Sequence, residues 1–180
     1  MRLTEKQSGV SLTEVLVAVM VLALAVVGAA ALQWRALRAA HEAALQSAAA
    51  RIAADLAEHL HAFHGRADNG FARFAFDAAA GREITAVPCH AASCTPAQLA
   101  AYEMQDLARR ARETLPEGRI LVCRDAVPWD PDRQAADWSC AEGEGAAVAP
   151  LVVKIGWRSR QDSPGARIRP LLVQPVFPSP

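Results

Sequence analysis

The most prominent pattern in the chain is an unbroken run of apolar residues near its start, at positions 15–32. Folded as an α-helix, this run of roughly 18 residues would measure about 27 Å, close to the hydrocarbon thickness of a bilayer. A short polar segment precedes it and carries one carboxylate close to the run, Glu14. The pattern predicts a membrane helix with an acidic residue near its beginning.

Helical character continues beyond the apolar run, because positions 29–64 contain no glycine and no proline. Apolar residues in this part recur every three or four positions, which places them on one face of a helix. The stripe comprises Trp34, Leu37, His41, Leu45, Ala48, Ile52, Leu56, Leu60 and Phe63. We therefore predict one long helix with an apolar first half and an amphipathic second half, whose stripe packs on a sheet. Gly65, Asn69 and Gly70 are expected to end it.

The segment that follows Cys94 predicts a second helix. Thr95 and Gln98 have the spacing of a capping box, and Pro96 stands in the first turn, where its missing N–H costs nothing. Apolar residues at helical spacing define its buried face, namely Ala100, Met104, Leu107, Ala111 and Leu115.

Three later segments have the composition of β-strands, at positions 119–124, 148–157 and 168–176. Pro170 and Pro175 mark the last of them as an edge strand. A short irregular segment containing Phe71, Phe74 and Phe76 is expected to cover one edge of the core. The expected fold class is α+β, with a long amino-terminal helix packed on a small antiparallel sheet and one extra helix.

Length and charge narrow the possible functions. In a chain of 180 residues, the long helix leaves room for one small domain. Lys plus Arg and Asp plus Glu number 19 each, so there is no overall basic field and no nucleic acid partner is expected. Arg2 and Lys6 precede the apolar run, and positive charge on that side favours a cytoplasmic amino terminus with the remainder of the chain outside.

All four cysteines, Cys89, Cys94, Cys123 and Cys140, lie beyond the apolar run, which predicts disulfides in an oxidising compartment. Four cysteines allow three pairings. Cys94 begins a helix of about 20 residues, and a strand returning from the end of that helix would leave Cys123 too far from Cys94 for a bond. We therefore favour Cys89 with Cys94 and Cys123 with Cys140. The second bond would hold the loop 125–139, which has little apolar content.

The six residues Gly9-Val10-Ser11-Leu12-Thr13-Glu14 resemble the type IV prepilin signal shared by pilins and type II secretion pseudopilins. The resemblance implies that a prepilin peptidase cuts after Gly9 and that the new amino terminus at Val10 is methylated. It also implies that Glu14 compensates the amino terminus of a neighbouring subunit during filament assembly. Val10 and Thr13 differ from the commonest residues of this signal, which are Phe or Met and an aliphatic residue.

A second resemblance covers CTPAQLAAYE, the LPEG that ends the helix, and ILVC. This pattern is similar to the PilV-type minor pilins, the type IV pilus modification proteins. It implies a leader at 1–9, a transmembrane and assembly segment at 10–33, and a periplasmic pilin-like domain at 34–180 that includes the amphipathic half of the helix. The implied protein crosses the inner membrane once and enters the pilus at or near its tip. The implied partners are other minor and major pilins, the prepilin peptidase and the inner-membrane assembly platform, and the implied role is initiation of pili that serve adhesion and twitching.

Three alternatives stay open. The chain could be a minor pseudopilin of a type II secretion system, or a membrane-tethered periplasmic enzyme or binding module. The apolar run could also be a secretory signal peptide cut after Ala29-Ala30-Ala31, although such runs usually span about 7–15 residues. Deletion of the gene would distinguish a pilin from a pseudopilin. Loss of twitching would indicate a pilin, and loss of protein secretion would indicate a pseudopilin.

No catalytic motif stands out, so we expect neither enzymatic activity nor a cofactor. A metal site is not expected either, because His59 does not share a helical face with His61, and only His61 and His64 do. The local basic cluster consists of Arg158, Arg160, Arg167 and Arg169. We interpret it as a solvated hairpin tip, with a DNA or partner contact as the second possibility.

Overall fold

The computed structural model describes residues 11–63, 70–81, 89, 93–141, 148–160, 162–163 and 165–177. Its elements, in chain order, are α1 (Leu12–Ala62), η1 (Gly70–Arg73), β1 (Ala75–Asp77), η2 (Ala78–Ala80), α2 (Pro96–Thr114), β2 (Arg119–Arg124), β3 (Leu151–Gly156) and β4 (Leu172–Phe177). The chain divides into two compact units, Met1–Ala43 and Ala44–Pro180, and α1 contributes to both. The fold class is α+β, as the sequence predicts.

In the first unit, the described residues form the amino-terminal part of α1. The helix begins after Ser11, whose carbonyl oxygen accepts the N–H groups of Glu14 and Val15 at 3.0 and 3.2 Å. The next proline of the chain after this point is Pro88, and Gly28 is the sole glycine in the helix. The predicted single long helix is therefore present within the described residues.

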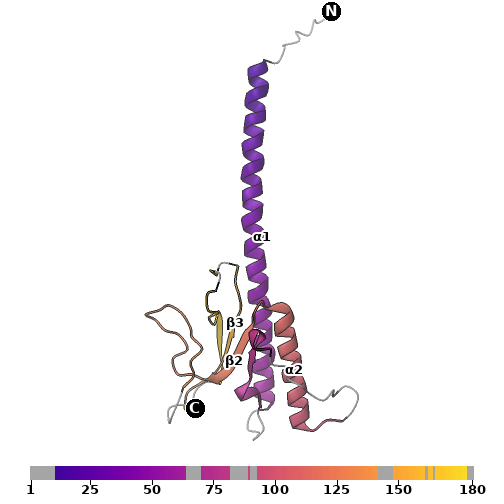
Figure 1. Ribbon diagram of the computed structural model, residues 1–180, viewed down its shortest axis with the longest axis vertical. Helices are drawn as coiled ribbons and strands as arrows, with labels where there is room; N and C mark the ends of the chain where they lie inside the picture. Colours follow the sequence, from indigo (N-terminus) through magenta and orange to yellow (C-terminus); the bar gives the residue numbers. More distant parts are fainter. Residues whose placement is uncertain are drawn as a thin grey trace, which may run out of the picture. The chain divides into compact units, whose positions relative to one another are not determined.

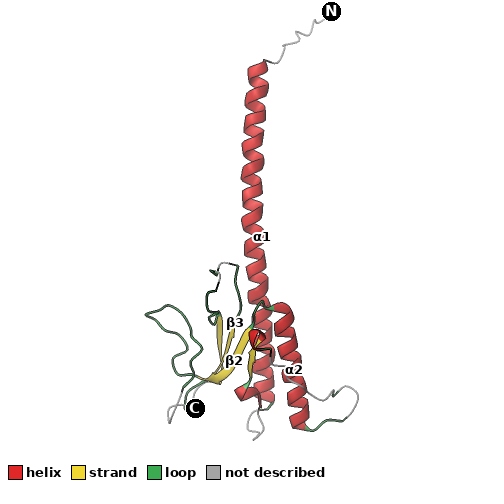
Figure 2. Ribbon diagram, viewed as in Figure 1, coloured by secondary structure: helices red, strands yellow, loops and turns green. Residues whose placement is uncertain are grey.

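The second unit consists of helices packed on one face of an antiparallel sheet of four strands in the order β1-β2-β3-β4 (Figure 2). Alternate residues of β3, such as Val153 and Ile155, join the same buried cluster as Leu56 of α1 and Leu107 of α2. The two helices are also joined by an ion pair between Asp55 and Arg110. The core thus lies between the sheet and the two helices.

The apolar stripe of α1 meets this core over only part of its length. From Leu45 onward its residues are buried, apart from the partly buried Ala48, whereas Trp34 and Leu37 are 57% and 66% exposed. The prediction that the whole stripe packs on the sheet is therefore wrong for its first residues, which belong to the first unit. A regular spacing shows that residues share a helix face but not how far along the helix a neighbour extends.

Helix α2 has the predicted capping box. The N–H of Thr95 donates to Gln98 Oε1 at 2.9 Å, and the N–H of Gln98 donates to Thr95 Oγ1 at 3.3 Å. Four of the five predicted face residues are buried and Met104 is partly buried. The helix then turns sharply into β2 at Gly118, where a Cβ would lie 2.9 Å from the Cβ of Leu115.

The strands differ from the predictions in three places. Phe76 lies on β1, a short edge strand paired with β2, and not in an irregular segment. Its three residues are too few to show alternation, so the neighbouring strand decides its conformation. Strand β3 is shorter than the predicted 148–157 and begins directly after Pro150, which has no N–H to donate.

Strand β4 begins later than predicted, at Leu172, and lies at the sheet edge as Pro175 indicates. The residues before it have other contacts. The carbonyl oxygen of Ile168 accepts the indole N–H of Trp138, and Pro170 cannot donate. The chain therefore pairs with β3 only from Leu171 onward, where the N–H donates to Ile155.

Candidate functional site

The start of α1 carries the first candidate site. Glu14 lies in the first helical turn, is exposed, and makes no ion pair within the described residues. A carboxylate in a first turn interacts favourably with the helix dipole, so its position there is also compatible with a purely structural role. The residues before Ser11, including Gly9 and Val10, lie outside the described residues.

The surface of α1 that follows Glu14 is apolar on every side. Its best 18-residue window has a mean hydropathy of 2.9, and none of that window is buried, so by length and composition this helix can cross a membrane. Large side chains from Val15 to Leu32 are exposed by 51% or more. A helix that is apolar all round requires lipid or other helices as neighbours.

The apolar surface ends at an aromatic and basic pair. Trp34 is half exposed, and the guanidinium of Arg38 lies over its ring at 4.9 Å from the centroid. Tryptophan and cationic side chains are typical of the boundary between hydrocarbon and water. The aromatic and basic pair thus directly follows the exposed apolar surface of the helix.

Two disulfides stabilise the second unit. Cys89 is bonded to Cys94 before α2, and Cys123 on β2 is bonded to Cys140, with Cα–Cα distances of 5.7 and 5.9 Å. These are the two local pairs that the distance argument favours. The second bond attaches the loop 125–139 to the sheet face opposite the helices.

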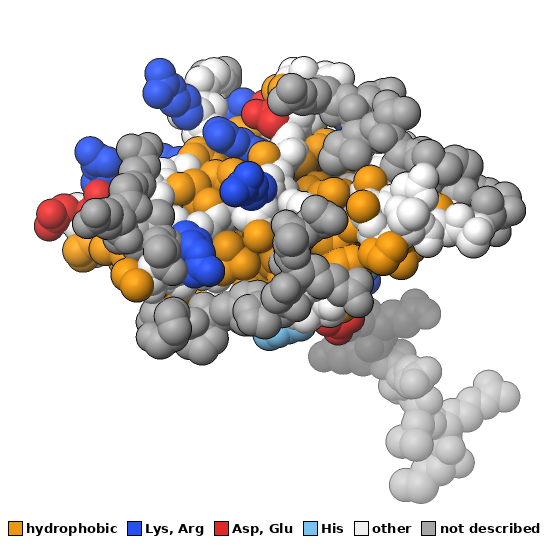
Figure 3. Space-filling model, turned by 90° about the horizontal axis from the view of Figure 1, so that it is seen from below, with side chains coloured by type: hydrophobic (Ala, Val, Ile, Leu, Met, Phe, Trp, Pro, Cys, Tyr) orange, Lys and Arg blue, Asp and Glu red, His pale blue; other side chains and the backbone are white. Residues whose placement is uncertain are grey.

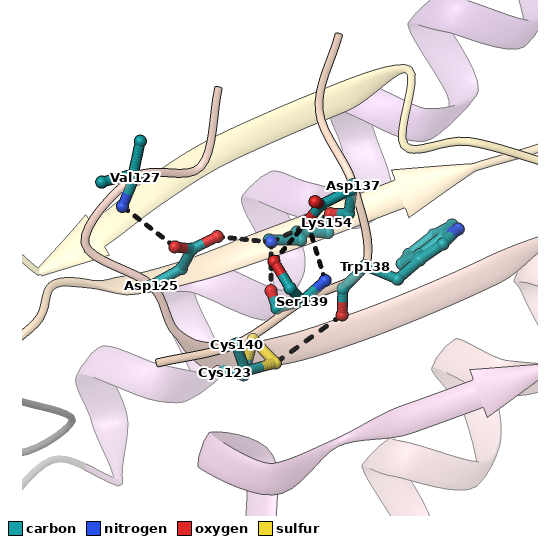
Figure 4. Close-up of a disulfide and its surroundings, with 8 residues drawn as sticks. All are labelled: Cys123, Asp125, Val127, Asp137, Trp138, Ser139, Cys140 and Lys154. Carbon is teal, nitrogen blue, oxygen red and sulfur yellow. Dashed lines mark hydrogen bonds and ion pairs between the residues drawn. A yellow bond between two sulfur atoms is a disulfide. The ribbon is translucent and has the colours of Figure 1, made fainter. Parts of the chain in front are cut away.

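The same loop is held by a buried lysine that the sequence analysis did not identify. Lys154 lies on β3 with a fully buried side chain, and its ammonium donates to Asp125 Oδ2 at 2.5 Å and to the carbonyl oxygens of Asp137 and Ser139 at 3.0 and 2.5 Å (Figure 4). An ammonium has three N–H donors, so all of them are used. The loop, which the sequence shows to have little apolar content, is therefore held by polar contacts in addition to the disulfide. The available signal was a single cation inside the apolar strand LVVKIG.

Trp138 places the end of this loop against the sheet. Its ring lies over Gly156, where a Cβ would come within 2.9 Å of the ring and 2.3 Å of the carbonyl oxygen of Arg169. The guanidinium of Arg119 covers the ring at 4.4 Å from its centroid. A side chain at position 156 would therefore prevent Trp138 and the backbone of Arg169 from packing this closely against β3.

A groove of about 880 Å³ lies beside Trp138, between the loop 130–138 on one side and Arg158 with residues 165–170 on the other. Its arginines include three of the predicted basic cluster, Arg158, Arg167 and Arg169. Arg158 is not a solvated tip residue, because it forms a two-point ion pair with Glu117 at 3.2 and 2.7 Å. Hydrogen bonding from Arg158 lowers the pKa of Glu117. The interpretation of the cluster as a solvated tip is thus wrong for this residue.

The histidines do not form a metal site within the described residues, and His64 lies outside them. His59 instead stacks on Phe71 with ring centroids 4.9 Å apart, and its Nε2 lies 3.8 Å from a carboxylate oxygen of Glu103. This histidine therefore contributes to the packing of α1 against η1 and α2.

Comparison with protein families agrees with these features. Residues 5–30 match the prokaryotic N-terminal methylation motif, and residues 31–105 match the family described as type IV pilin Tt1218. These two matches make the chain similar to type IV pilins over residues 5–105. No curated protein and no solved structure shows significant similarity to it.

The pilin family is structural, and the exposed apolar helix suits a pilin that is anchored in a membrane and incorporated in a pilus. The methylation motif implies processing by a prepilin peptidase and assembly with other pilins. The long helix, α2 and the four-stranded sheet of this chain are consistent with the type IV pilin fold.

Proposed function

We propose that this protein is a minor pilin that takes part in the initiation and assembly of type IV pili. The observation that carries the proposal is the beginning of α1, where one carboxylate, Glu14, precedes a helix that is apolar on all sides. The similarity of the CTPAQLA segment to PilV-type minor pilins supports the minor role. Other minor and major pilins and the inner-membrane assembly platform are the proposed partners.

We propose that the chain consists of three segments. Residues 1–9 form the leader, residues 10–33 form the membrane and assembly segment, and residues 34–180 form the periplasmic domain. The apolar surface that ends at Trp34 supports the second boundary. Before assembly the apolar segment lies in the inner membrane, and afterwards it packs among the same segments of other subunits, at or near the pilus tip.

Glu14 would act in the transfer from membrane to filament. A carboxylate within the membrane is costly, by roughly 2.5–3.5 kcal/mol at the bilayer centre and less near the interface. An ammonium at the amino terminus of a neighbouring subunit would compensate that cost, because two opposite charges that are buried together stabilise each other. The carboxylate thus favours a packed arrangement of subunits over an isolated helix.

Replacing Glu14 by alanine should leave leader cleavage and membrane insertion intact but strongly reduce incorporation into pili. Immunoblots of sheared pili and of membrane fractions measure the two quantities. Glu58→Ala is the matched control, because Glu58 is an exposed acidic residue on the amphipathic half of the same helix. Normal incorporation of the Glu14 variant would contradict the proposed role. In a strain lacking the gene, loss of protein secretion with normal twitching would indicate a secretion pseudopilin instead.

Processing gives an independent prediction. If the peptidase cuts after Gly9, the mature chain begins at Val10 with a methylated amino group, and Gly9→Val leaves the leader attached while insertion persists. Intact-mass spectrometry of the purified protein distinguishes the two forms. A mature amino terminus near residue 32 would identify the apolar run as a secretory signal peptide and would exclude a membrane role for α1.

A further inference from the structure

The groove beside Trp138 has features that pilus assembly through α1 does not use. It lies at the sheet end where β2 begins and β3 finishes, and its walls are the disulfide-bonded loop and the segment leading to β4. Its charged lining residues are Arg119, Arg133, Arg158, Arg167, Arg169, Asp77, Asp130 and Asp137. At about 880 Å³ the groove has the size of a site for a small molecule or a few residues of peptide.

The carboxylates of the groove are already occupied by local hydrogen bonds. Asp77 accepts the N–H of Ala79, and Asp137 accepts the N–H and the hydroxyl of Ser139, which lowers the pKa of Asp137. Asp130 accepts two backbone N–H groups and pairs with Arg133 at 3.5 Å. The acceptors of the groove are therefore largely engaged.

The donors are not. Within the described residues, the guanidinium groups of Arg119, Arg167 and Arg169 form no hydrogen bond or ion pair. Arg119 is half-buried and its guanidinium is oriented by the ring of Trp138, whereas Arg167 and Arg169 are exposed. A guanidinium carries five N–H donors in a rigid planar fork that fits a carboxylate in two-point contact. The groove therefore offers an excess of directed donors and positive charge.

We propose that this groove binds an acidic peptide segment of a partner protein, whose carboxylates pair with Arg119, Arg167 and Arg169. The protein already contains one contact of this kind. Arg158, which also lines the groove, holds the carboxylate of Glu117 through two hydrogen bonds. The ligand supplies the same chemistry from outside. The proposal depends on the groove alone and would stand if the assembly role of Glu14 failed.

The surroundings favour a peptide over a nucleic acid. The three aspartates would repel a continuous phosphate backbone, but they leave room for carboxylates at separate points. On the face of the molecule in Figure 3, Lys and Arg side chains stand apart from one another among apolar ones. The chain also has equal numbers of cationic and anionic residues, so it lacks the field that gathers nucleic acid.

The test is calorimetric titration of the full-length protein in detergent micelles with a blocked synthetic hexapeptide containing four glutamates. We expect binding that weakens with salt, no binding of the same peptide with glutamine in place of glutamate, and a loss of about tenfold or more in affinity for Arg119→Gln and for Arg169→Gln. Arg109→Gln is the matched control, because Arg109 is an exposed cation on α2 outside the groove and its removal should leave affinity unchanged.

Arg119 is half-buried, so its replacement could impair folding, whereas Arg169 is exposed and its variant tests the proposal independently. The thermal unfolding transition of each variant is measured together with its affinity. Absence of binding by the glutamate peptide overturns the proposal. So does an equal loss with Arg109→Gln, which would indicate a nonspecific charge effect. Tighter binding of a thymidine oligonucleotide or of oligogalacturonate than of the glutamate peptide would assign the groove to a nucleic acid or an acidic sugar instead.

Discussion

Replacing Lys154 by methionine is expected to lower the free energy of unfolding of the globular domain by about 3–5 kcal/mol. Methionine has a similar length but no charge. Its introduction leaves the carboxylate of Asp125 buried without its cation and removes the donor from the carbonyl oxygens of Asp137 and Ser139. An unpaired buried charge is more destabilising than the loss of the pair itself.

Urea denaturation followed by near-ultraviolet circular dichroism measures this change in the full-length protein. Arg109→Met is a matched control, because Arg109 also forms ion pairs but is 58% exposed, and its replacement should leave the free energy of unfolding nearly unchanged. The double variant Lys154→Met with Asp125→Asn should recover part of the loss, since it removes the buried charge. A loss below 1 kcal/mol for Lys154→Met alone would show that the ammonium does not hold the loop.

Removing the disulfide between Cys123 and Cys140 by a double serine substitution should cost about 3 kcal/mol. The two cysteines are 17 positions apart, and in the chain-entropy model the stabilisation grows with the length of the closed loop. Thermal unfolding of the double serine variant measures the effect. The loop that it closes also contains Asp125 and Asp137, so this loss and that of Lys154→Met should not be additive.

The matched control is the double serine substitution of Cys89 and Cys94. This pair is only 5 positions apart, so its removal should cost less, about 2 kcal/mol. Removing the Cys123–Cys140 bond should also weaken peptide binding in the groove, whose wall is formed by the same loop, whereas removing the other bond should not. An equal or larger destabilisation from the Cys89–Cys94 pair, or free thiols at Cys123 and Cys140 in protein made in the periplasm, would contradict the assignment.

Several features of this protein are determined by the sequence itself. The two helices follow from local patterns, since the cap of α2 involves Thr95 and Gln98 three positions apart and the apolar run of α1 needs no partner to be recognised. Strand β2 has the predicted bounds, and Pro175 places β4 at an edge. The length of the second helix and the strand returning from its end argued against a bond between Cys94 and Cys123 and so favoured the local disulfide pairs, because these distances limit which cysteines can meet.

Other features depend on the tertiary structure. The burial of Lys154, the contact of Trp138 with Gly156 and the pairing of β1 with β2 all join residues that are distant in sequence, and no local spacing encodes them. The apolar stripe of α1 also shows that local spacing does not determine burial. Trp34 and Leu45 belong to the same helical pattern, but of these two only Leu45 packs in a core. Periodicity decides which side chains share a face, whereas the neighbours brought by the rest of the chain decide whether that face is buried.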